Sequence, residues 1–192
     1  MNVAIIGMRG AGKSNVSRRL GFLTKRPVLS TDVLVEYETG MTIPAYVAAH
    51  GWSSFRTREL AVIERIAAMD GVIVDCGGGI VVDLDPATGD EVFSERKVRA
   101  LRDRGPVVWL RGDIDRLAAK TAADPQRPRL DATRDAADIM RRRLPFYEQA
   151  ADHVVDIESH KRSVMALDLA VRYADDLGLS PDLVQALREK RD

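Results

Sequence analysis

A glycine-rich segment that follows a short apolar run is the feature that most constrains the fold of this chain. Residues 7–14 read GMRGAGKS and fit the pattern G-x-x-x-x-G-K-[ST] without a mismatch. The apolar run Val3–Gly7 leads into them, and a helical pattern over Ser14–Leu23 follows. A loop of this kind binds phosphate groups where it joins a buried strand to the start of a helix. The segment therefore predicts an α/β fold with a phosphate site at the end of its first strand.

The residue types in this phosphate-binding loop (the P-loop) indicate its ligand. Glycines let backbone N–H groups turn toward phosphate oxygens, and the helix N-terminus adds the positive end of its dipole. Lys13 is expected to reach the β- and γ-phosphates, and the Ser14 hydroxyl is expected to hold Mg²⁺. We therefore predict that a nucleoside triphosphate binds through Gly10, Ala11, Gly12, Lys13, Ser14 and Asn15.

Further short apolar runs alternate with longer helical patterns along the rest of the chain. This alternation is typical of a parallel sheet, and strands that are apolar along their whole length are covered by helices on both faces. We predict a single domain over residues 1–192, with a three-layer α/β/α architecture and a five-stranded parallel sheet. After Val3–Gly7, the predicted strands are Pro27–Thr31, Val72–Cys76, Val107–Arg111 and His153–Ile157.

Composition excludes several classes of protein. The 192 residues carry 29 basic and 29 acidic side chains, so the charge balance gives no reason to expect a nucleic-acid partner. No apolar run approaches the roughly 20 residues that a membrane span needs. The start of the chain lacks the pattern of a signal peptide. A single cysteine, Cys76, cannot form an internal disulfide. We expect a cytoplasmic protein without a membrane partner.

Candidate acceptor-side residues follow the second and third strands. Asp32 comes just after the second strand, and Asp75 and the run Gly77–Gly79 come at the end of the third. Ligands of an open α/β sheet bind beyond the carboxyl ends of its strands, so these residues are expected beside the P-loop. A triple glycine lets a substrate approach backbone N–H groups directly.

Two segments interrupt the alternation of strands and helices. Asp83–Phe93 contains the turn-forming sequence DPATGD and is interpreted as a hairpin or loop excursion. Ala123–Arg134 is polar and contains two prolines, a pattern that indicates a mobile loop between helices and therefore a lid.

Together these segments resemble the shikimate kinase family from Met1 to about Ile157. Members of that family phosphorylate the 3-hydroxyl of shikimate, a small acidic cyclohexene triol, with MgATP in the aromatic amino-acid pathway. The resemblance implies the same activity, a P-loop kinase fold and a monomer. It is carried by the P-loop, Asp32 with Thr39–Ile43, Gly51–Glu59, Gly77–Gly79, Arg127-Pro128 and Arg143–Tyr147.

The resemblance also implies a role for individual side chains. Asp32 would accept hydrogen bonds from the ring hydroxyls and act as a base, and Arg56 and Arg143 would hold the substrate carboxylate. The helical segment at about 32–69 and the backbone of Gly77, Gly78 and Gly79 would bind the rest of the substrate. For the nucleotide, Lys120 would lie against the adenine, and Arg127 on the lid would neutralise charge on the transferring phosphoryl group, beside Lys13.

The chain departs from the family pattern in two places. Ser30 stands where the family has a first aspartate that helps to hold Mg²⁺ through water. We hypothesise that Asp75 takes over this role, with Ser14 as the direct ligand; the alternative is that Asp75 caps a neighbouring helix. The segment Asp83–Arg104 is longer than the family's usual connection, and it either shapes a wall of the acceptor pocket or covers a partner surface.

Two alternative functions stay open at this point. The same fold suits a kinase that acts on a nucleotide or on another small hydroxy acid. A chain that binds ATP without catalysis is the other alternative, and Ser30 is its only support.

Overall fold

The structure, a computed structural model, describes residues 1–122, 135–159 and 161–191. Its main sheet has the strand order β2-β3-β1-β6-β7, and every neighbouring pair is parallel. This confirms the predicted five-stranded parallel sheet. The strands are β1 (Val3–Ile6), β2 (Val28–Ser30), β3 (Ile73–Asp75), β6 (Val107–Arg111) and β7 (His153–Asp156).

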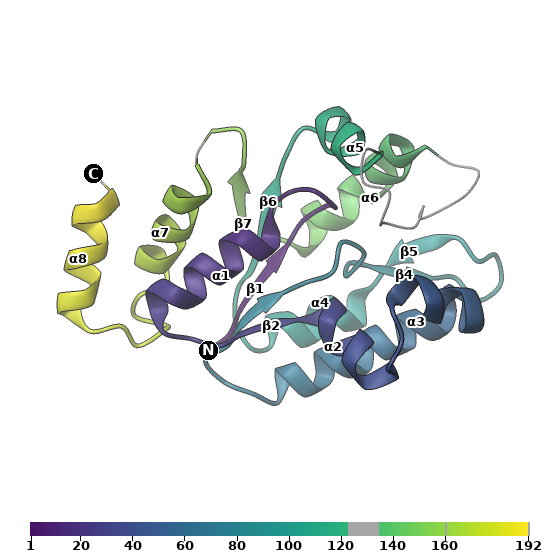
Figure 1. Cartoon of the computed structure of the whole chain (residues 1–192), viewed down its shortest axis with the longest axis horizontal. Helices are drawn as coiled ribbons and strands as arrows, with labels where there is room; N and C mark the ends of the chain where they lie inside the picture. Colours follow the sequence, from purple (N-terminus) through teal and green to yellow (C-terminus); the bar gives the residue numbers. More distant parts are fainter. Residues whose placement is uncertain (123–134, 160, 192) are drawn as a thin grey trace.

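Helices cover both faces of this sheet. Figure 1 shows α1, α7 and α8 on one side and α3, α4 and α6 on the other, which confirms the predicted three layers. The helices are α1 (Lys13–Thr24), α2 (Thr31–Thr39), α3 (Ile43–Ala67), α4 (Glu95–Arg102), α5 (Ile114–Ala122), α6 (Ala136–Ala150), α7 (Arg162–Arg172) and α8 (Pro181–Arg191).

The apolar strands form the centre of the core. Val3, Ile5 and Ile6 of β1 have no exposed surface, because a strand in the middle of a parallel sheet has helices on both faces. Leu20 of α1 and Leu169 of α7 pack into the same core. The strands are apolar along their whole length in the sequence because helices bury both of their faces.

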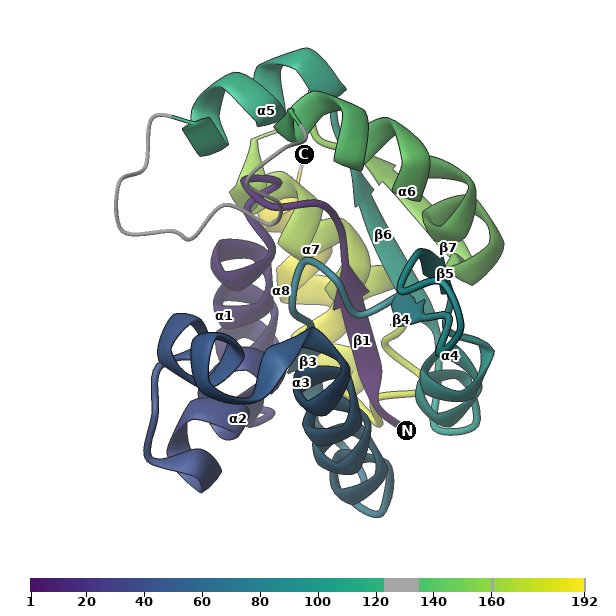
Figure 2. The same ribbon diagram turned by 90° about the vertical axis from the view of Figure 1, so that its right-hand side faces the viewer.

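Strand order brings the candidate site residues to one edge. β1 lies between β3 and β6. The strands that follow β1 in the sequence are added first on the β3 side and later on the β6 side, so the strand order reverses at β1. Ligands of such sheets bind beyond the carboxyl ends of the strands at this reversal. Asp75 at the end of β3 is in register with Ile5 on β1 and with Ser30 on β2. Figure 2 looks toward this edge, with α2 and α3 below the end of β1 and α5 and α6 above it.

The segment after the triple glycine forms the predicted hairpin. β4 (Val82–Leu84) and β5 (Glu91–Phe93) pair antiparallel, with Leu84 opposite Glu91. Asp85 closes the turn by accepting hydrogen bonds from the N–H groups of Ala87 and Thr88, at 2.8 and 3.0 Å. The hairpin is a separate two-stranded sheet beside the main one.

The long helix α3 is broken once. Gly51 has φ 77° and ψ 167°, values that only glycine adopts readily, so two helices meet at a kink at this residue. The sequence predicts two helices, Ile43–His50 and Ser53–Met69, with Gly51 as the stop. The structure agrees on the break but leaves no linker between the two parts.

The predicted lid, Ala123–Arg134, lies outside the described residues, and Arg127 lies outside them with it. None of the helices in the described part of the chain is both long enough and apolar enough to cross a membrane.

Candidate active site

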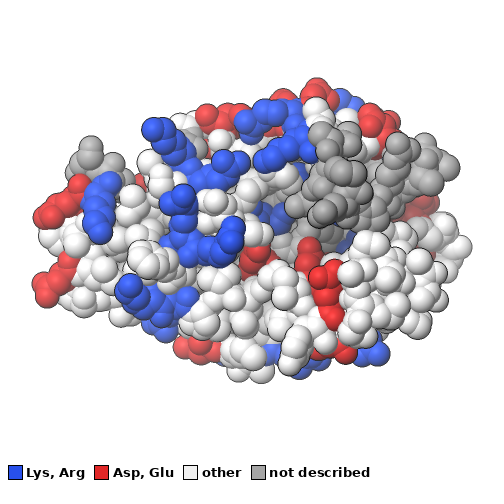
Figure 3. All heavy atoms as spheres, viewed as in Figure 1, with Lys and Arg blue, Asp and Glu red and all other residues white. Residues whose placement is uncertain are grey.

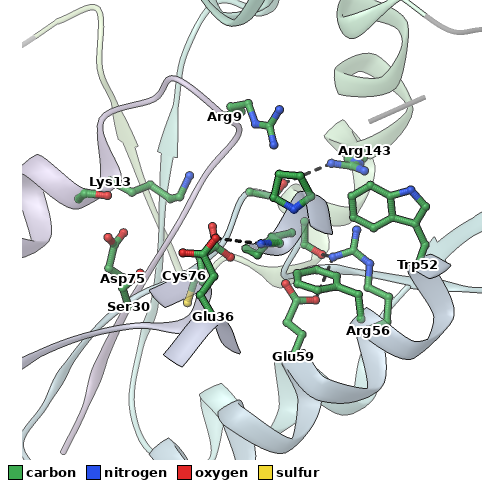
Figure 4. A pocket seen from close by; sticks show the side chains of 17 residues that line it. Arg9, Lys13, Ser30, Glu36, Trp52, Arg56, Glu59, Asp75, Cys76 and Arg143 are labelled. Atoms are coloured by element: carbon green, nitrogen blue, oxygen red, sulfur yellow. Dashed lines mark hydrogen bonds and ion pairs between the residues drawn. The ribbon is translucent and has the colours of Figure 1, made fainter. Parts of the chain in front are cut away.

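A cavity of about 500 Å³ opens at the carboxyl edge of the sheet, a size that suits a small molecule. Figure 4 shows which side chains lie at its two ends. Lys13, Asp75 and Ser30 lie at one end, and Arg56 and Arg143 lie at the other, beside Trp52. The cavity therefore offers a phosphate end and, across from it, an end that suits an anionic group.

The P-loop adopts the conformation that its glycines allow. Gly10 and Gly12 have φ 87° and 90°, in the left-handed region that favours glycine. The Lys13 ammonium donates to the carbonyl oxygens of Gly7 and Met8, at 2.9 and 3.2 Å, and so stays folded over the loop. Lys120 donates to the Gly10 carbonyl at 3.1 Å, which places α5 beside the loop.

A second cavity of about 370 Å³ adjoins the P-loop on its outer side. The predicted nucleotide residues Gly10, Gly12, Lys13, Ser14, Asn15 and Lys120 line it, together with Arg18, Thr121 and Arg162. Ala11, the other predicted residue of the loop, is fully buried beneath it. Figure 3 shows Lys and Arg side chains gathered on the face formed by α1, α5 and α7, which attracts anions to this cavity.

Asp32 lies in the first turn of α2, whose N-terminus the Ser30 side chain caps by accepting from the Val33 N–H. Removal from solvent raises the pKa of Asp32 to about 6, and the nearby carboxylates of Glu59 and Asp75 add to this rise, against the opposing charges of Lys13 and Arg9. A Cβ atom on Gly77 would lie 2.2 Å from the Asp32 Oδ1 atom. Gly77 is therefore required for this carboxylate to fit.

Arg56 reaches the cavity from α3 and is 4% exposed. Its Nη1 atom donates to Glu59 Oε2 at 3.0 Å and to the Gly79 carbonyl at 3.1 Å. Its guanidinium also lies over the rings of Trp52 and Phe55, at 5.5 and 5.4 Å from their centroids. A Cβ atom on Gly79 would come within 2.6 Å of the Arg56 Nη2 atom, so a side chain here would displace the guanidinium.

Arg143 reaches the same end of the cavity from α6 and is 3% exposed. Its Nε atom donates to Glu91 Oε2 at 2.8 Å, its Nη2 atom is paired with Glu91 Oε1, and its Nη1 atom lies 3.4 Å from the Gly78 carbonyl. A lone arginine in a sequence is ordinarily a surface or helix-pairing charge. The burial of both Arg56 and Arg143 excludes a surface charge, although Arg56 also pairs with Glu59 on its own helix.

Two buried charges, one that lines the cavity and one that does not, are absent from the sequence predictions. Glu59 and Lys97 are 1% and 0% exposed, and the Lys97 ammonium donates to Glu59 Oε2 at 2.7 Å and to the Val82 carbonyl at 2.5 Å. Burial alone would raise the pKa of Glu59, but Lys97 and Arg56 hold that pKa below its ordinary value. The spacing of Arg56 and Glu59 by three residues on one helix is the only signal in the sequence for this cluster.

Tyr147 supports the triple glycine from below. It is fully buried, its hydroxyl donates to the Gly78 carbonyl at 2.8 Å, and its ring stacks on Trp109 with the centroids 5.8 Å apart. Its role is therefore in packing, with one hydrogen bond that fixes the glycine loop.

The residues at the phosphate end fit a magnesium ion held mainly by phosphate and water. Ser14 and Asp75 both line the cavity, and Asp75 is only 7% exposed. Mg²⁺ takes oxygen ligands and keeps several waters, so one hydroxyl and one carboxylate are the usual protein share. In the part of the chain that the structure describes, no group of three or more His, Cys, Asp or Glu side chains forms a metal site by itself.

Fold and site together define a P-loop kinase whose acceptor carries an acidic group. The sequence model of the shikimate kinase family matches residues 9–171, and the chain belongs to this family. A shikimate kinase from Leptospira biflexa is 45% identical over 152 residues, which cover 79% of this chain and 83% of that protein. One from Pseudomonas syringae pv. syringae is 33% identical over 177 residues, covering 91% and 96%.

Solved structures agree with the sequence comparison. The shikimate kinase from Acinetobacter baumannii, solved in complex with shikimate, superposes with a TM-score of 0.77 at 26% identity over 91% of this chain and 93% of that one. The enzyme from Aquifex aeolicus superposes with a TM-score of 0.75 over 92% and 98%, and its 21% identity shows the shared fold alone.

The raised pKa of Asp32 predicts a stabilising substitution. Above pH 6 the folded protein holds an ionised carboxylate that is better solvated when unfolded, so Asp32→Asn should raise the free energy of unfolding by about 3 kcal/mol at pH 8. The gain should shrink as the pH falls from 6 toward the ordinary pKa of 3.8, and it should be small at pH 4, where the folded carboxyl group is protonated and the unfolded one is only partly ionised. Urea denaturation at the two pH values measures it.

Asp176→Asn, at an exposed position, is the control and should give no such difference. An Asp32→Asn protein that is less stable than the unmodified one at pH 8 would contradict the assigned cause of the pKa shift.

Proposed function

We propose that this chain transfers the γ-phosphoryl group of ATP to the 3-hydroxyl of shikimate, in the aromatic amino-acid pathway. The observation that carries the proposal is the pair of buried arginines, Arg56 and Arg143, at the end of the cavity that faces away from Lys13. Membership of the shikimate kinase family supports it, and so does the related structure from Acinetobacter baumannii that holds shikimate.

The arginine pair selects for an acid. Two guanidinium groups at one end of a cavity match the two oxygens of a carboxylate by parallel, charge-assisted hydrogen bonds. A neutral sugar needs hydroxyl partners but gains nothing from such a pair. Arg56 and Arg143 would therefore hold the shikimate carboxylate and turn the ring so that its hydroxyl groups face Asp32 and the backbone of Gly77–Gly79.

Asp32 would position the reacting hydroxyl and receive its proton. As the 3-oxygen forms its bond to the γ-phosphorus and the bond to the β-phosphate oxygen breaks, the hydroxyl proton passes to an Asp32 oxygen and ADP leaves. A pKa of about 6 keeps this carboxylate ionised at neutral pH while making it a better proton acceptor than an exposed aspartate. Phosphoryl transfer otherwise depends on positioning and charge neutralisation.

The nucleotide would lie in the cavity on the outer side of the P-loop. Backbone N–H groups at residues 10–15 would surround the phosphates, and Lys13 would exchange its two carbonyl partners for phosphate oxygens. Lys120, already on the Gly10 carbonyl, would lie against the adenine. Arg127 would add positive charge to the transferring group from the lid segment.

Ser14 would be the direct protein ligand of Mg²⁺, and Asp75 would act through a bound water. The ion, when bound, neutralises charge on the β- and γ-phosphates. Ser30, which stands at the family's aspartate position, uses its hydroxyl to cap α2. Asp75 is in register beside Ser30 on the next strand, so a carboxylate remains at this edge, displaced by one strand.

The remaining parts of the proposal concern the protein as a whole. We infer a monomer in the cytoplasm, as the family implies. The fold alone does not decide the acceptor, because a gluconokinase from Sinorhizobium meliloti also superposes, with a TM-score of 0.54 at 16% identity. The acceptor assignment therefore depends on Arg56 and Arg143, the two arginines at one end of the cavity.

Parallel assays of ADP release test the proposal, with MgATP and either shikimate, quinate or gluconate as acceptor. We expect rapid turnover with shikimate alone. Arg56→Ala should lower kcat/KM for shikimate by about a hundredfold or more, because it removes one charge of a buried pair and leaves Glu59 with one partner fewer. Turnover with a different acceptor only, or ATP binding without turnover on any acceptor, would overturn the assignment.

Gly79→Ala separates acceptor binding from nucleotide binding. The added Cβ atom would displace the Arg56 guanidinium, while the backbone at residue 79 is outside the left-handed region and accepts alanine without strain. We expect the KM for shikimate to rise by about tenfold, and the KM for ATP to stay within about twofold. Steady-state kinetics with each substrate varied in turn measures both. An equal rise in both constants would argue against a contact specific to Arg56.

Asp75→Asn tests the metal assignment. Loss of the carboxylate should raise the Mg²⁺ concentration for half-maximal activity by about tenfold, since a charge-assisted contact to a metal-bound water is lost. A Mg²⁺ titration at saturating ATP and shikimate measures the shift, with Asp176→Asn as the matched control. A titration curve that coincides with that of the unmodified protein would assign Asp75 to a structural role instead.

A further inference from the structure

The β4–β5 hairpin brings a carboxylate to one of the two substrate arginines. Glu91, the first residue of β5, accepts from the Nε and Nη2 atoms of Arg143 on α6. Arg143 and Gly78 line the cavity, whereas Glu91 is not among its lining residues in the described part of the chain. The carboxylate of Glu91 thus contacts the guanidinium from outside the cavity.

The contact leaves one edge of the Arg143 guanidinium for a ligand. Of its five N–H groups, Glu91 takes the one on Nε and one on Nη2, and the Gly78 carbonyl lies nearest to Nη1. With the Gly78 carbonyl on Nη1, one N–H group on Nη1 and one on Nη2 remain. A second carboxylate uses one N–H group on each Nη atom when it forms a bidentate pair.

The hairpin itself is fixed to the body of the protein at several points. Asp83 on β4 accepts from the Ser94 hydroxyl at 2.7 Å and from Arg96 Nε at 2.8 Å. The buried Lys97 ammonium donates to the Val82 carbonyl, and the ring of Phe93 packs on Phe146 of α6 with the centroids 6.1 Å apart. Glu91 therefore stands on a rigid support that also contacts the helix carrying Arg143.

Each substrate arginine has its own carboxylate partner. Arg56 has Glu59, three residues along the same helix, and Arg143 has Glu91 from the hairpin. A buried guanidinium without a partner would turn toward the nearest oxygen or draw in water, because its charge needs hydrogen-bond acceptors. The carboxylates of Glu59 and Glu91 therefore hold the two guanidinium groups in place at this end of the cavity.

We propose that Glu91 is a positioning residue for acceptor binding: it orients Arg143 so that the open edge of its guanidinium meets the substrate carboxylate. The inference rests on the proposed function, because it takes shikimate as the acceptor. It assigns the extended hairpin segment a role on the acceptor side and none on the nucleotide side.

Steady-state kinetics on Glu91→Gln tests this role, with Glu95→Gln, an exposed substitution of equal charge change four residues away, as the control. We expect the KM for shikimate to rise by about tenfold in Glu91→Gln, as for the loss of one charge-assisted contact. The KM for ATP and kcat should stay within about twofold. Glu91→Asp, which keeps the carboxylate, should recover part of the loss, and Glu95→Gln should behave like the unmodified protein.

A double-mutant cycle shows whether Glu91 acts through Arg143. The dissociation constant of shikimate is measured from the fluorescence of Trp52, which lines the cavity, in Glu91→Gln, Arg143→Met and the combined variant. We expect Glu91→Gln to weaken binding when Arg143 is present and to have no further effect in the Arg143→Met background.

Each of the following results would overturn the inference. A lower KM for shikimate in Glu91→Gln would mean that Glu91 competes with the substrate for Arg143. Additive effects in the cycle, or equal rises in the KM of shikimate and of ATP, would reduce Glu91 to a general structural role. If the unmodified protein neither binds nor phosphorylates shikimate, the proposed function fails as well; if it does both and Glu91→Gln keeps the same KM, only the inference fails.

Discussion

The guanidinium groups of Arg56 and Arg143 are charged and almost fully buried, and much of the surrounding structure follows from that burial. Desolvating a charge is unfavourable by several kcal/mol unless the protein supplies a partner and further hydrogen bonds. Here Glu59 and Glu91 supply the charges, and the carbonyl oxygens of Gly78 and Gly79 supply the acceptors. The glycine loop is therefore shaped as much by the arginines as by a ligand.

The buried carboxylate of Glu59 also needs a second charged partner. Glu59 is as deeply buried as Arg56, so Lys97 from α4 adds a second positive charge at the same Oε2 atom, and Lys97 also donates to the Val82 carbonyl. In this way a single requirement connects α3, α4 and the β4–β5 hairpin. The P-loop end of the cavity differs, because the phosphate groups that we propose to bind there would be held mainly by backbone N–H groups and the helix dipole.

The parts that sequence reasoning predicted are those governed by local or topological rules. The P-loop is recognised from one motif in its context, the five strands from their apolar runs, and the meeting of Asp32 with the triple glycine from the rule that strand ends share an edge. The roles of individual side chains in catalysis stay predictions. Glu59, Lys97 and Glu91 were missed because a charged residue in an amphipathic helix or hairpin has the same pattern whether it faces water or a buried partner. Only tertiary packing distinguishes the two cases.

Substitutions in the β4–β5 hairpin have different consequences in its turn and in its strands. Its turn, from Pro86 to Asp90, is exposed, while its two strands are held by the buried Lys97 and by the half-buried Phe93. Mutation in the turn can accumulate without reaching the cavity, whereas a substitution at the single position Glu91 alters acceptor recognition and leaves the P-loop as it is. Acceptor preference and nucleotide chemistry can therefore evolve independently in this fold.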